Sequence, residues 1–392
     1  MTEGFSRPRV LYVDHIARMS GGEIALLRTL VRMRDRVAAL VVLGEDGPFA
    51  EALGTAGIAV RVLPLDPAVR DVRRDRVLRL GALRGVVSTV HYILALRRLI
   101  RAERPDLVHT NTLKAALYGG AAARLARVPV VWHIRDRIAD DYLPPTTVRL
   151  IRLAARVLPA AIITNSEATM STLPSVRCPT LVVRDAALPP VAPEPTPRSS
   201  HLTIGMAGRL TEWKGQDYFL RAFALAFHGT TVNASIIGSA LFGEDHYAAG
   251  LVRLAAELDI TDQVEFRGFR ADMWSEYSRL DMLVHFSLTP EPYGQVVVEG
   301  MSAGLCVLAA AEGGPAELIE DEVTGVLVPP RNVEALSTAM LRWARDAAGR
   351  ARIAEAARGV TAALDPELTT APIVELYRTV ARAHGPALTG PR

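Results

Sequence analysis

The stretch Leu202-Thr-Ile-Gly-Met-Ala-Gly-Arg-Leu-Thr-Glu-Trp-Lys-Gly215 decides the fold, because it joins a strand pattern to a glycine loop. The apolar pattern Tyr218–Phe227 that follows predicts a helix. A strand, a glycine loop and a helix in this order form the phosphate-binding opening of a Rossmann-like unit. The order recurs where the strand pattern Arg9–Asp14 leads into Met19-Ser-Gly-Gly-Glu23 and the helix pattern Ile24–Val31. Neither loop is a complete G-x-G-x-x-G motif, so the prediction rests on the recurrence of the plan in two halves.

Short apolar runs alternate with helical patterns through both halves. This alternation predicts an α/β fold with parallel sheets covered by helices on both faces. The further strands that we expect are Ala38–Leu43, Ala59–Leu63, Leu107–His109, Val128–His133, Ala161–Thr164 and Thr180–Val183, then Ala234–Ile237, Val264–Arg267, Met282–Phe286, Val307–Ala309 and Val326–Val328.

The length and one proline-rich stretch predict the domain organisation. A chain of 392 residues is longer than one core usually organises, so we expect two domains. Residues 188–200 hold five prolines within nine positions, which predicts an extended link. Residues 1–187 and 201–370 then form two Rossmann-like domains, whose sheets we expect to face a central cleft. The helix pattern Pro372–His384 predicts that residues 371–392 pack back on the first domain.

Composition indicates a globular protein. The chain is 49% hydrophobic and 22% charged, with a net charge of +3. Cys178 and Cys306 form neither a disulfide framework nor a zinc pattern, so we expect a reducing, cytoplasmic environment. We expect no signal peptide, because no basic segment followed by an apolar stretch opens the chain. The most apolar segment, Val86–Ile100, is too short and too charged to span a bilayer.

The positive charge is concentrated in residues 70–104, which hold ten arginines interleaved with Leu, Val and Ile. This pattern predicts one or two basic amphipathic helices. One interpretation is a solvated helix face. The other is a site for anionic lipid, on the inner face of the membrane, or for a phosphorylated acceptor. Nucleic acid is not an expected partner, because no nucleic-acid motif accompanies the charge.

The motif Glu291-Pro-Tyr-Gly-Gln-Val-Val-Val-Glu299 places two carboxylates eight positions apart. Glu291 precedes a Pro-Tyr-Gly turn, and the run Gln295–Ala303 predicts a helix that contains Glu299. The N–H groups at that helix start would point toward the same space as Glu291. Such a constellation would hold a polyhydroxylated anion, with hydroxyls on the carboxylates and phosphate on the amides.

Together these motifs resemble the retaining glycosyltransferases of family 4, which have the GT-B fold and an E-x7-E motif. The resemblance is strongest over residues 202–330, where order and spacing both match. It rests on Gly208–Gly215, Val264–Gly268, Glu291–Gly294, Val298–Gly304, Gly313–Glu317 and Gly325–Val328. The first half matches more loosely, through Ser20–Gly22, His109-x-Asn111, His133–Arg135 and Asn165–Ser166.

The resemblance assigns roles to individual residues. Arg209 and Lys214 would bind the donor diphosphate, Glu299 the ribose and Glu291 the sugar hydroxyls. Lys214 is one of only two lysines among 45 basic residues, and a compact ammonium suits a pyrophosphate oxygen. The donor-binding set implied is Gly21, Gly22, Arg209, Lys214, Gly268, Glu291, Tyr293, Gly294, Gln295 and Glu299. In the alternative interpretations Glu299 lies on a helix surface and Glu291 caps a helix.

The first half would supply the acceptor site and one catalytic group. The catalytic set implied is His133, Glu291, Arg209 and Lys214, with His133 near the reacting sugar. The acceptor-binding set is His109, Asn111, Arg135 and Asp136. Strand-end histidines are also often structural, Gly21 and Gly22 could simply start a helix, and Arg135 and Asp136 could pair with each other.

The activity implied is transfer of a sugar from a nucleotide diphosphate sugar to an acceptor hydroxyl, with retained anomeric configuration. The first domain would bind the acceptor and the second the nucleotide sugar. The acceptor could be lipid-linked, a glycan or a natural product. No Asp-x-Asp motif appears, so we expect no metal and no cofactor, with Arg209, Lys214 and helix starts neutralising the leaving group. Two alternatives are a sugar-nucleotide epimerase on the same fold and a non-catalytic nucleotide-sugar-binding protein.

Overall fold

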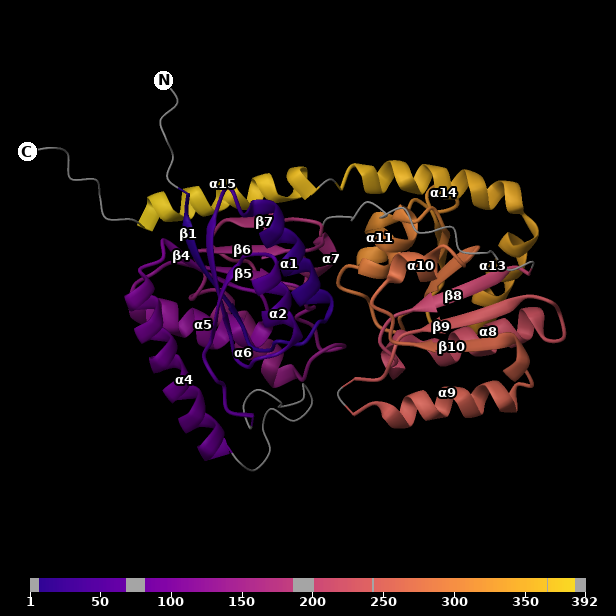
Figure 1. Cartoon of the computed structure of the whole chain (residues 1–392), viewed down its shortest axis with the longest axis horizontal. Coiled ribbons are helices and arrows are strands. Elements are labelled where there is room, and N and C mark those ends of the chain that lie inside the picture. The colour runs from indigo at the N-terminus through magenta and orange to yellow at the C-terminus, as the bar shows by residue number, and fades with distance from the viewer. Residues whose placement is uncertain (1–6, 68–81, 186–200, 242, 365, 385–392) are drawn as a thin grey trace, which may run out of the picture. The chain divides into compact units, whose positions relative to one another are not determined.

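The computed structural model describes residues 7–67, 82–185, 201–241, 243–364 and 366–384. It divides into two compact units, and each is described by itself (Figure 1). The first comprises residues 1–186 and 366–392, and the second residues 187–365. The predicted proline-rich link, residues 188–200, and residues 70–81 of the arginine-rich segment lie outside the described residues.

The first unit is built on a seven-stranded parallel sheet with the order β3-β2-β1-β4-β5-β6-β7. Its strands are β1 (Arg9–Asp14), β2 (Ala38–Leu43), β3 (Ala59–Val62), β4 (Leu107–Thr110), β5 (Val130–Ile134), β6 (Ala161–Thr164) and β7 (Thr180–Val182). The second unit has a six-stranded parallel sheet with the order β10-β9-β8-β11-β12-β13. Its strands are β8 (Thr203–Ala207), β9 (Asn233–Ile237), β10 (Val264–Gly268), β11 (Met282–His285), β12 (Cys306–Ala310) and β13 (Val326–Val328). The prediction of two parallel α/β domains is confirmed.

Helices cover both faces of the first sheet, and a separate hydrophobic cluster fills each side. One cluster is contributed by α4 (Ala82–Glu103), α5 (Leu113–Ala126) and α6 (Pro145–Ala155). The other is contributed by α1 (Gly21–Met33), α2 (Pro48–Thr55) and α15 (Pro366–His384). The short helix α7 (Glu167–Met170) follows β6. Because both faces of the central strands are buried, these strands are mainly apolar rather than alternating.

The second unit repeats this layering. The larger cluster packs α8 (Gln216–Phe227), α9 (Asp245–Glu257) and α13 (Val333–Arg345) on the sheet. The opposite cluster includes residues of α10 (Met273–Tyr277), α11 (Gln295–Ser302), α12 (Gly314–Leu318) and α14 (Ala347–Ala362). The 3-10 turns Glu212–Lys214 and Thr261–Gln263 complete the described elements.

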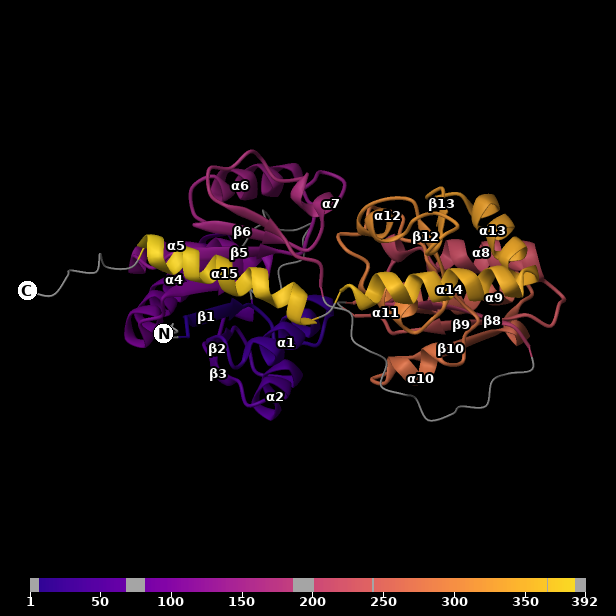
Figure 2. The same cartoon turned by 90° about the horizontal axis from the view of Figure 1, so that it is seen from above.

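Helix α15, yellow in Figures 1 and 2, packs on α1 and β4 of the first unit. Its buried side includes Ile373, Val374, Tyr377 and Val380. The prediction that this helix starts at Pro372 is wrong, because it starts at Pro366 and carries Pro372 inside. A proline within a helix costs one hydrogen bond. Pro366 takes the place in the first turn that the prediction gave to Pro372.

The strand order reverses once in each unit, between β1 and β4 and between β8 and β11. Helices leave opposite faces of the sheet at such a switch point, which opens a crevice beyond the carboxyl ends of the two strands. Asp14 and Asn111 lie at this place in the first unit, and Gly208 and Phe286 lie there in the second. The topology therefore indicates where ligands bind in each unit.

Candidate active site

In the second unit, Lys214 and Glu291 form an ion pair near the switch point. Lys214 ends the 3-10 turn after β8, and its Nζ donates to Glu291 Oε2 over 2.7 Å. Both side chains are nearly buried, with 14% and 13% of their surface exposed. Lys214 also lies over the Trp213 ring, 4.4 Å from its centroid. An ammonium group has three N–H donors, so Lys214 can bind Glu291 and a phosphate oxygen at once.

Two further side chains converge on Glu291. Ser287 Oγ donates to Glu291 Oε2 over 2.9 Å, and His285 Nε2 lies 3.6 Å from the same oxygen. Burial by itself raises the pKa of Glu291, but Lys214 and His285 outweigh it and hold this pKa below its usual range. Glu291 is therefore anionic at neutral pH and suited to accept hydrogen bonds from sugar hydroxyls.

Close backbone contacts hold the Glu291 loop in place. The backbone oxygen of Glu291 accepts from Gly314 N over 2.8 Å. A Cβ on Gly313, whose φ is +66°, would lie 2.3 Å from that same oxygen. A Cβ on Gly314 would lie 2.3 Å from the backbone oxygen of Tyr293. Glycine is required at both positions because backbone passes directly over backbone.

Helix α11 directs its N-terminus and Glu299 toward this region of the second unit. It begins at Gln295, after Gly294 in the left-handed conformation with φ of 93°. Its first amides lie outside the helix's own hydrogen-bond ladder and can serve an anion. Glu299 lies one turn inside the helix and accepts from Tyr277 Oη over 2.9 Å. Tyr293 is buried beneath the turn and packs in the α11 cluster.

Arg209 lies two residues after the end of β8, and its side chain contacts Glu244. Its Nε lies 3.7 Å from Glu244 Oε2, and Thr211 Oγ1 donates to the other oxygen over 2.6 Å. The backbone oxygen of Arg209 accepts from Gln216 Nε2 over 2.9 Å, which ties the loop to α8. Gly268 ends β10, and its backbone oxygen accepts from Gly238 N over 2.9 Å.

In the first unit, Asn111 and Arg135 connect the carboxyl ends of three strands. Asn111 Nδ2 donates to Asp14 Oδ2 over 2.9 Å and to the backbone oxygen of Gly22 over 3.2 Å. Arg135 Nε donates to Asn111 Oδ1 over 3.0 Å, and its Nη1 pairs with Asp185. Gly21 and Gly22 form the first turn of α1 rather than a preceding loop.

At the carboxyl edge of the first sheet, Arg135 and Asp136 pair with other residues rather than with each other. Arg135 binds Asp185, whereas Asp136 Oδ1 accepts from Tyr142 Oη over 2.8 Å.

His109 and His133 lie deep in the same edge. Their rings meet edge to face with centroids 5.3 Å apart, and both residues are buried. Burial, reinforced by the charge of Arg135, lowers the pKa of His109 to about 3 and that of His133 well below its usual value. Both imidazoles are therefore neutral at physiological pH.

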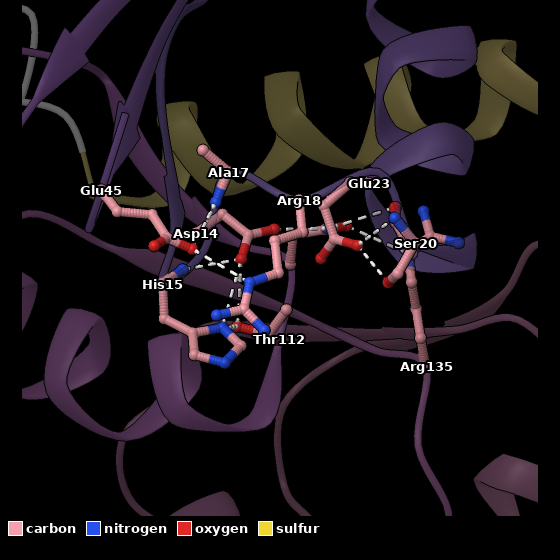
Figure 3. Close-up of polar contacts among 11 residues, drawn as sticks. Asp14, His15, Ala17, Arg18, Ser20, Glu23, Glu45, Thr112 and Arg135 are labelled. Atoms are coloured by element: carbon pink, nitrogen blue, oxygen red, sulfur yellow. Dashed lines mark hydrogen bonds and ion pairs between the residues drawn. The ribbon is translucent and has the colours of Figure 1, made fainter. Parts of the chain in front are cut away.

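Glu23 in α1 is also buried, and Figure 3 shows its side chain next to Ser20. Its carboxylate accepts from the backbone N of Ser20 over 3.2 Å and from the Ser20 hydroxyl, which forms a capping box for α1. Burial and the nearby charge of Asp14 raise the pKa of Glu23 to about 8. Glu23 therefore holds a proton at neutral pH.

This raised pKa predicts that stability falls as pH rises. The contribution of Glu23 is complete below its unfolded pKa and is lost as pH rises through about 8. Urea unfolding should show the wild type losing about 2 kcal/mol or more between pH 5 and pH 9. Glu23→Gln should remove most of this slope, because an amide keeps the cap and carries no charge. Glu51→Gln, at an exposed position in α2, is the matched control and should keep the slope.

Some members of these clusters were not predicted from the sequence, namely Asp14, Glu23, Asp185, Glu244, Tyr277, His285, Ser287 and Tyr377. A usable signal existed for His285, a histidine near the carboxyl end of an apolar strand, as His109 and His133 also are. Asp185 and Tyr377 lie far from their partners in sequence and carry no local signal. Within the described ranges, no three His, Cys, Asp or Glu residues cluster closely enough to hold a metal ion.

Two family models match the chain. "Glycosyltransferase Family 4" covers residues 24–183, and "Glycosyl transferases group 1" covers residues 193–360. Among solved structures, HepE from Anabaena in complex with UDP and glucose is 28% identical with a TM-score of 0.83, over 95% of this chain and 100% of that one. Sucrose-phosphate synthase from Thermosynechococcus elongatus shares the fold at 17% identity and a TM-score of 0.76, over 96% of this chain and 100% of that one.

Sequence relatives match over shorter regions. The D-inositol 3-phosphate glycosyltransferase of Salinispora arenicola is 28% identical over 194 residues, which are 47% of this chain and 42% of that protein. The chain thus spans less than half the length of that relative. Two parallel α/β units with polar residues at each switch point define a protein of the GT-B class. With both family models matched in order along it, the chain belongs to glycosyltransferase family 4, as the resemblance implied.

Proposed function

We propose that this chain transfers a sugar from a nucleoside diphosphate sugar to an acceptor hydroxyl, with retention of anomeric configuration. The observation that carries the proposal is the Lys214–Glu291 pair, which places one cation and one anion at the switch point of the second unit. The cation suits a diphosphate and the anion suits sugar hydroxyls. The HepE structures with UDP and with UDP-glucose support a uridine diphosphate donor.

The proposed reaction needs no covalent intermediate with the protein. The acceptor oxygen forms a bond to the anomeric carbon on the face from which the diphosphate leaves, and the carbon–oxygen bond to phosphate breaks. The acceptor proton passes to the departing phosphate oxygen. Lys214, Arg209 and the α11 amides stabilise the charge that develops there, in place of a metal held by the protein. Glu291 orients the sugar, and Glu299 holds the ribose.

Ligand-induced thermal stabilisation tests the donor site directly. UDP and UDP-glucose should each raise the melting temperature of the wild type, because a ligand that binds only the folded state stabilises it. The double variant Lys214→Ala/Glu299→Ala should show no shift. Lys114→Ala, which changes the only other lysine, is the control and should keep the full shift. An unchanged shift in the double variant would refute the proposed site.

Turnover separates an enzyme from a binding protein. UDP-glucose without acceptor should be hydrolysed slowly, with release of UDP. Conversion to another UDP-hexose would instead indicate an epimerase. Binding without any turnover across a panel of nucleotide sugars and acceptors would indicate a non-catalytic protein.

We further propose that the α4–α5–α6 layer of the first unit contacts an anionic membrane surface from the cytoplasmic side, where a lipid-linked acceptor would lie. These three helices carry eight Lys or Arg residues and one acidic residue. Helices α1, α2 and α15, on the other face, carry four of each sign. The basic layer also exposes apolar side chains, namely Val86, Val87, Val90, Leu125, Leu150 and Leu153. Basic charge with exposed apolar groups is typical of membrane-surface helices. No helix in the described part of the chain is long and apolar enough to cross a bilayer.

Vesicle co-sedimentation tests this surface. The protein should bind vesicles that contain anionic lipid, and binding should fall at high salt. Leu153→Asp on α6 should weaken binding severalfold. Leu225→Asp on α8 is the matched control, since the two leucines are 62% and 63% exposed. Equal binding to neutral vesicles, or equal loss in both variants, would contradict the proposal.

A further inference from the structure

A hydrogen-bonded chain of three buried residues links α15 to the histidine edge of the first unit. Tyr12 on β1 and Tyr377 on α15 have hydroxyl oxygens 3.2 Å apart. Tyr377 Oη lies 2.9 Å from Nδ1 of His109 on β4. Tyr12 and Tyr377 are fully buried, and His109 is 1% exposed. Residues from opposite ends of the chain thus form one hydrogen-bonded chain that ends at Nδ1 of His109.

The direction of the hydrogen bonds follows from counting buried partners. Burial raises the pKa of both tyrosines above the usual range, so both hydroxyls keep their protons. If Tyr12 donates to Tyr377 and Tyr377 donates to His109 Nδ1, only the N–H at Nε2 of His109 lacks a partner among the described residues. In the reverse direction, the Tyr12 hydroxyl proton and His109 Nε2 would both lack one. An unmade buried hydrogen bond is costly, so the first direction is preferred.

The neighbouring His133 reaches the same protonation state by a different contact. Arg135 Nη2 lies 3.5 Å from Nδ1 of His133. A guanidinium group can only donate, so Nδ1 of His133 carries no proton and Nε2 does. Nε2 of His133 is buried and, within the described residues, has no hydrogen-bond partner. The two imidazoles therefore present two N–H donors, and neither is a base.

We propose that Tyr377 is a positioning residue, which donates to His109 Nδ1 and thereby keeps the proton of His109 on Nε2. With the N–H of His133, which the contact with Arg135 sets, it would give the first unit two donors for a substrate oxygen. This inference rests on the proposed transfer reaction, and it agrees with the departing phosphate as the proton acceptor. Without the Tyr377 hydroxyl, Nδ1 of His109 has no donor, and the ring can take the other tautomer or turn. A turn of the His109 ring would also change its edge-to-face contact with the His133 ring, whose centroid is 5.3 Å away.

Nitrogen-15 NMR of histidine-labelled protein tests the tautomer without any substrate. His109, assigned with a His109→Gln variant, should carry its proton on Nε2 in the wild type. Tyr377→Phe, which keeps the buried ring, should shift His109 toward a mixture of tautomers and should move the His133 signals. Tyr12→Phe is the matched control, because it removes one buried hydroxyl and leaves the Tyr377 donor in place. A proton on Nδ1 in the wild type, or an unchanged spectrum in Tyr377→Phe, would overturn the proposal.

Kinetics provide the second measurement. Tyr377→Phe should lower kcat for UDP-glucose hydrolysis about 5- to 10-fold while KM for the donor stays within about twofold, since the proposed cations for the diphosphate, Arg209 and Lys214, are in the other unit. Tyr12→Phe should remain within about twofold of the wild type. A rise in KM with unchanged kcat would contradict a positioning role. If no nucleotide sugar is turned over, the proposed function fails, while the NMR measurement still decides the role of Tyr377.

Discussion

Lys214→Ala is expected to lower kcat/KM for a nucleotide sugar by about 100- to 1,000-fold and to destabilise the second unit. The catalytic loss follows because the cation that would stabilise the leaving diphosphate is gone, and removal of one such group typically costs about 100- to 1,000-fold. The loss of stability follows because Glu291 remains nearly buried without its partner. Breaking a buried pair from one side costs about 3–5 kcal/mol. Urea unfolding and steady-state kinetics measure the two effects.

A second substitution separates stability from activity. Lys214→Met/Glu291→Leu removes both charges and keeps apolar volume, so it should recover most of the lost stability, since buried pairs can often be replaced by apolar groups at little cost. It should remain inactive. In the single variant the pKa of Glu291 rises above its usual value, because burial persists without the lysine charge. Its deficit should therefore be larger at pH 7 than at pH 4. A stable, active Lys214→Ala protein would refute the assigned role.

Gly238→Ala should strongly destabilise the second unit. A Cβ at this position would lie 2.0 Å from the backbone oxygen of Gly208, at the start of the loop that carries Arg209 and Lys214. The φ of Gly238 is +140°, where a side chain adds strain of about 1–3 kcal/mol. Overlap and strain together should cost about 3–5 kcal/mol of unfolding free energy, near the upper limit for single substitutions. UDP binding should weaken as the loop shifts.

The chain contains a matched control for this substitution. Gly208 has almost the same φ, +141°, but a Cβ there would have no neighbour within 4 Å. Gly208→Ala should therefore show only the backbone strain, about 1–3 kcal/mol. The difference between the two variants measures the steric overlap. Equal losses of unfolding free energy in the two variants would mean that steric overlap with the Gly208 backbone does not contribute to the cost of Gly238→Ala.

Local patterns were sufficient for the fold. Apolar runs such as Met282–Phe286 predicted strands that match the structure within a residue or two, because strands buried on both faces must be apolar throughout. The glycine loops after the first strand of each half predicted a Rossmann-like opening, and the strand order of the structure places both at switch points. The predicted start of α15 was wrong, because Pro366 and Pro372 give the same local signal and the helix begins at the first of them.

The candidate site could be predicted only in part. Two short motifs contain the four predicted donor-site residues: one holds Arg209 and Lys214, and the other holds Glu291 and Glu299. The resemblance named all four residues, because each motif is recognisable from local spacing. Their pairing was not predicted, because Lys214 and Glu291 are 77 positions apart and nothing in the sequence relates one loop to the other. Asp136 shows the same limit, since its tyrosine partner became apparent only after the loop was folded.

By itself, the sequence determined the two parallel α/β units, their glycine loops and the residue types available for a dianion and for sugar hydroxyls. Each of these follows from periodicity or from spacing along a few turns of chain. The tertiary structure alone decided which charges neutralise each other, which carboxylate keeps a proton and which ring nitrogens carry hydrogen. Those properties depend on burial and on partners distant in sequence, as with Glu23 beside Asp14 and Tyr377 behind His109. The protonation of groups such as Glu23 and His109 depends on contacts that exist only where the parallel sheet brings the ends of its strands together.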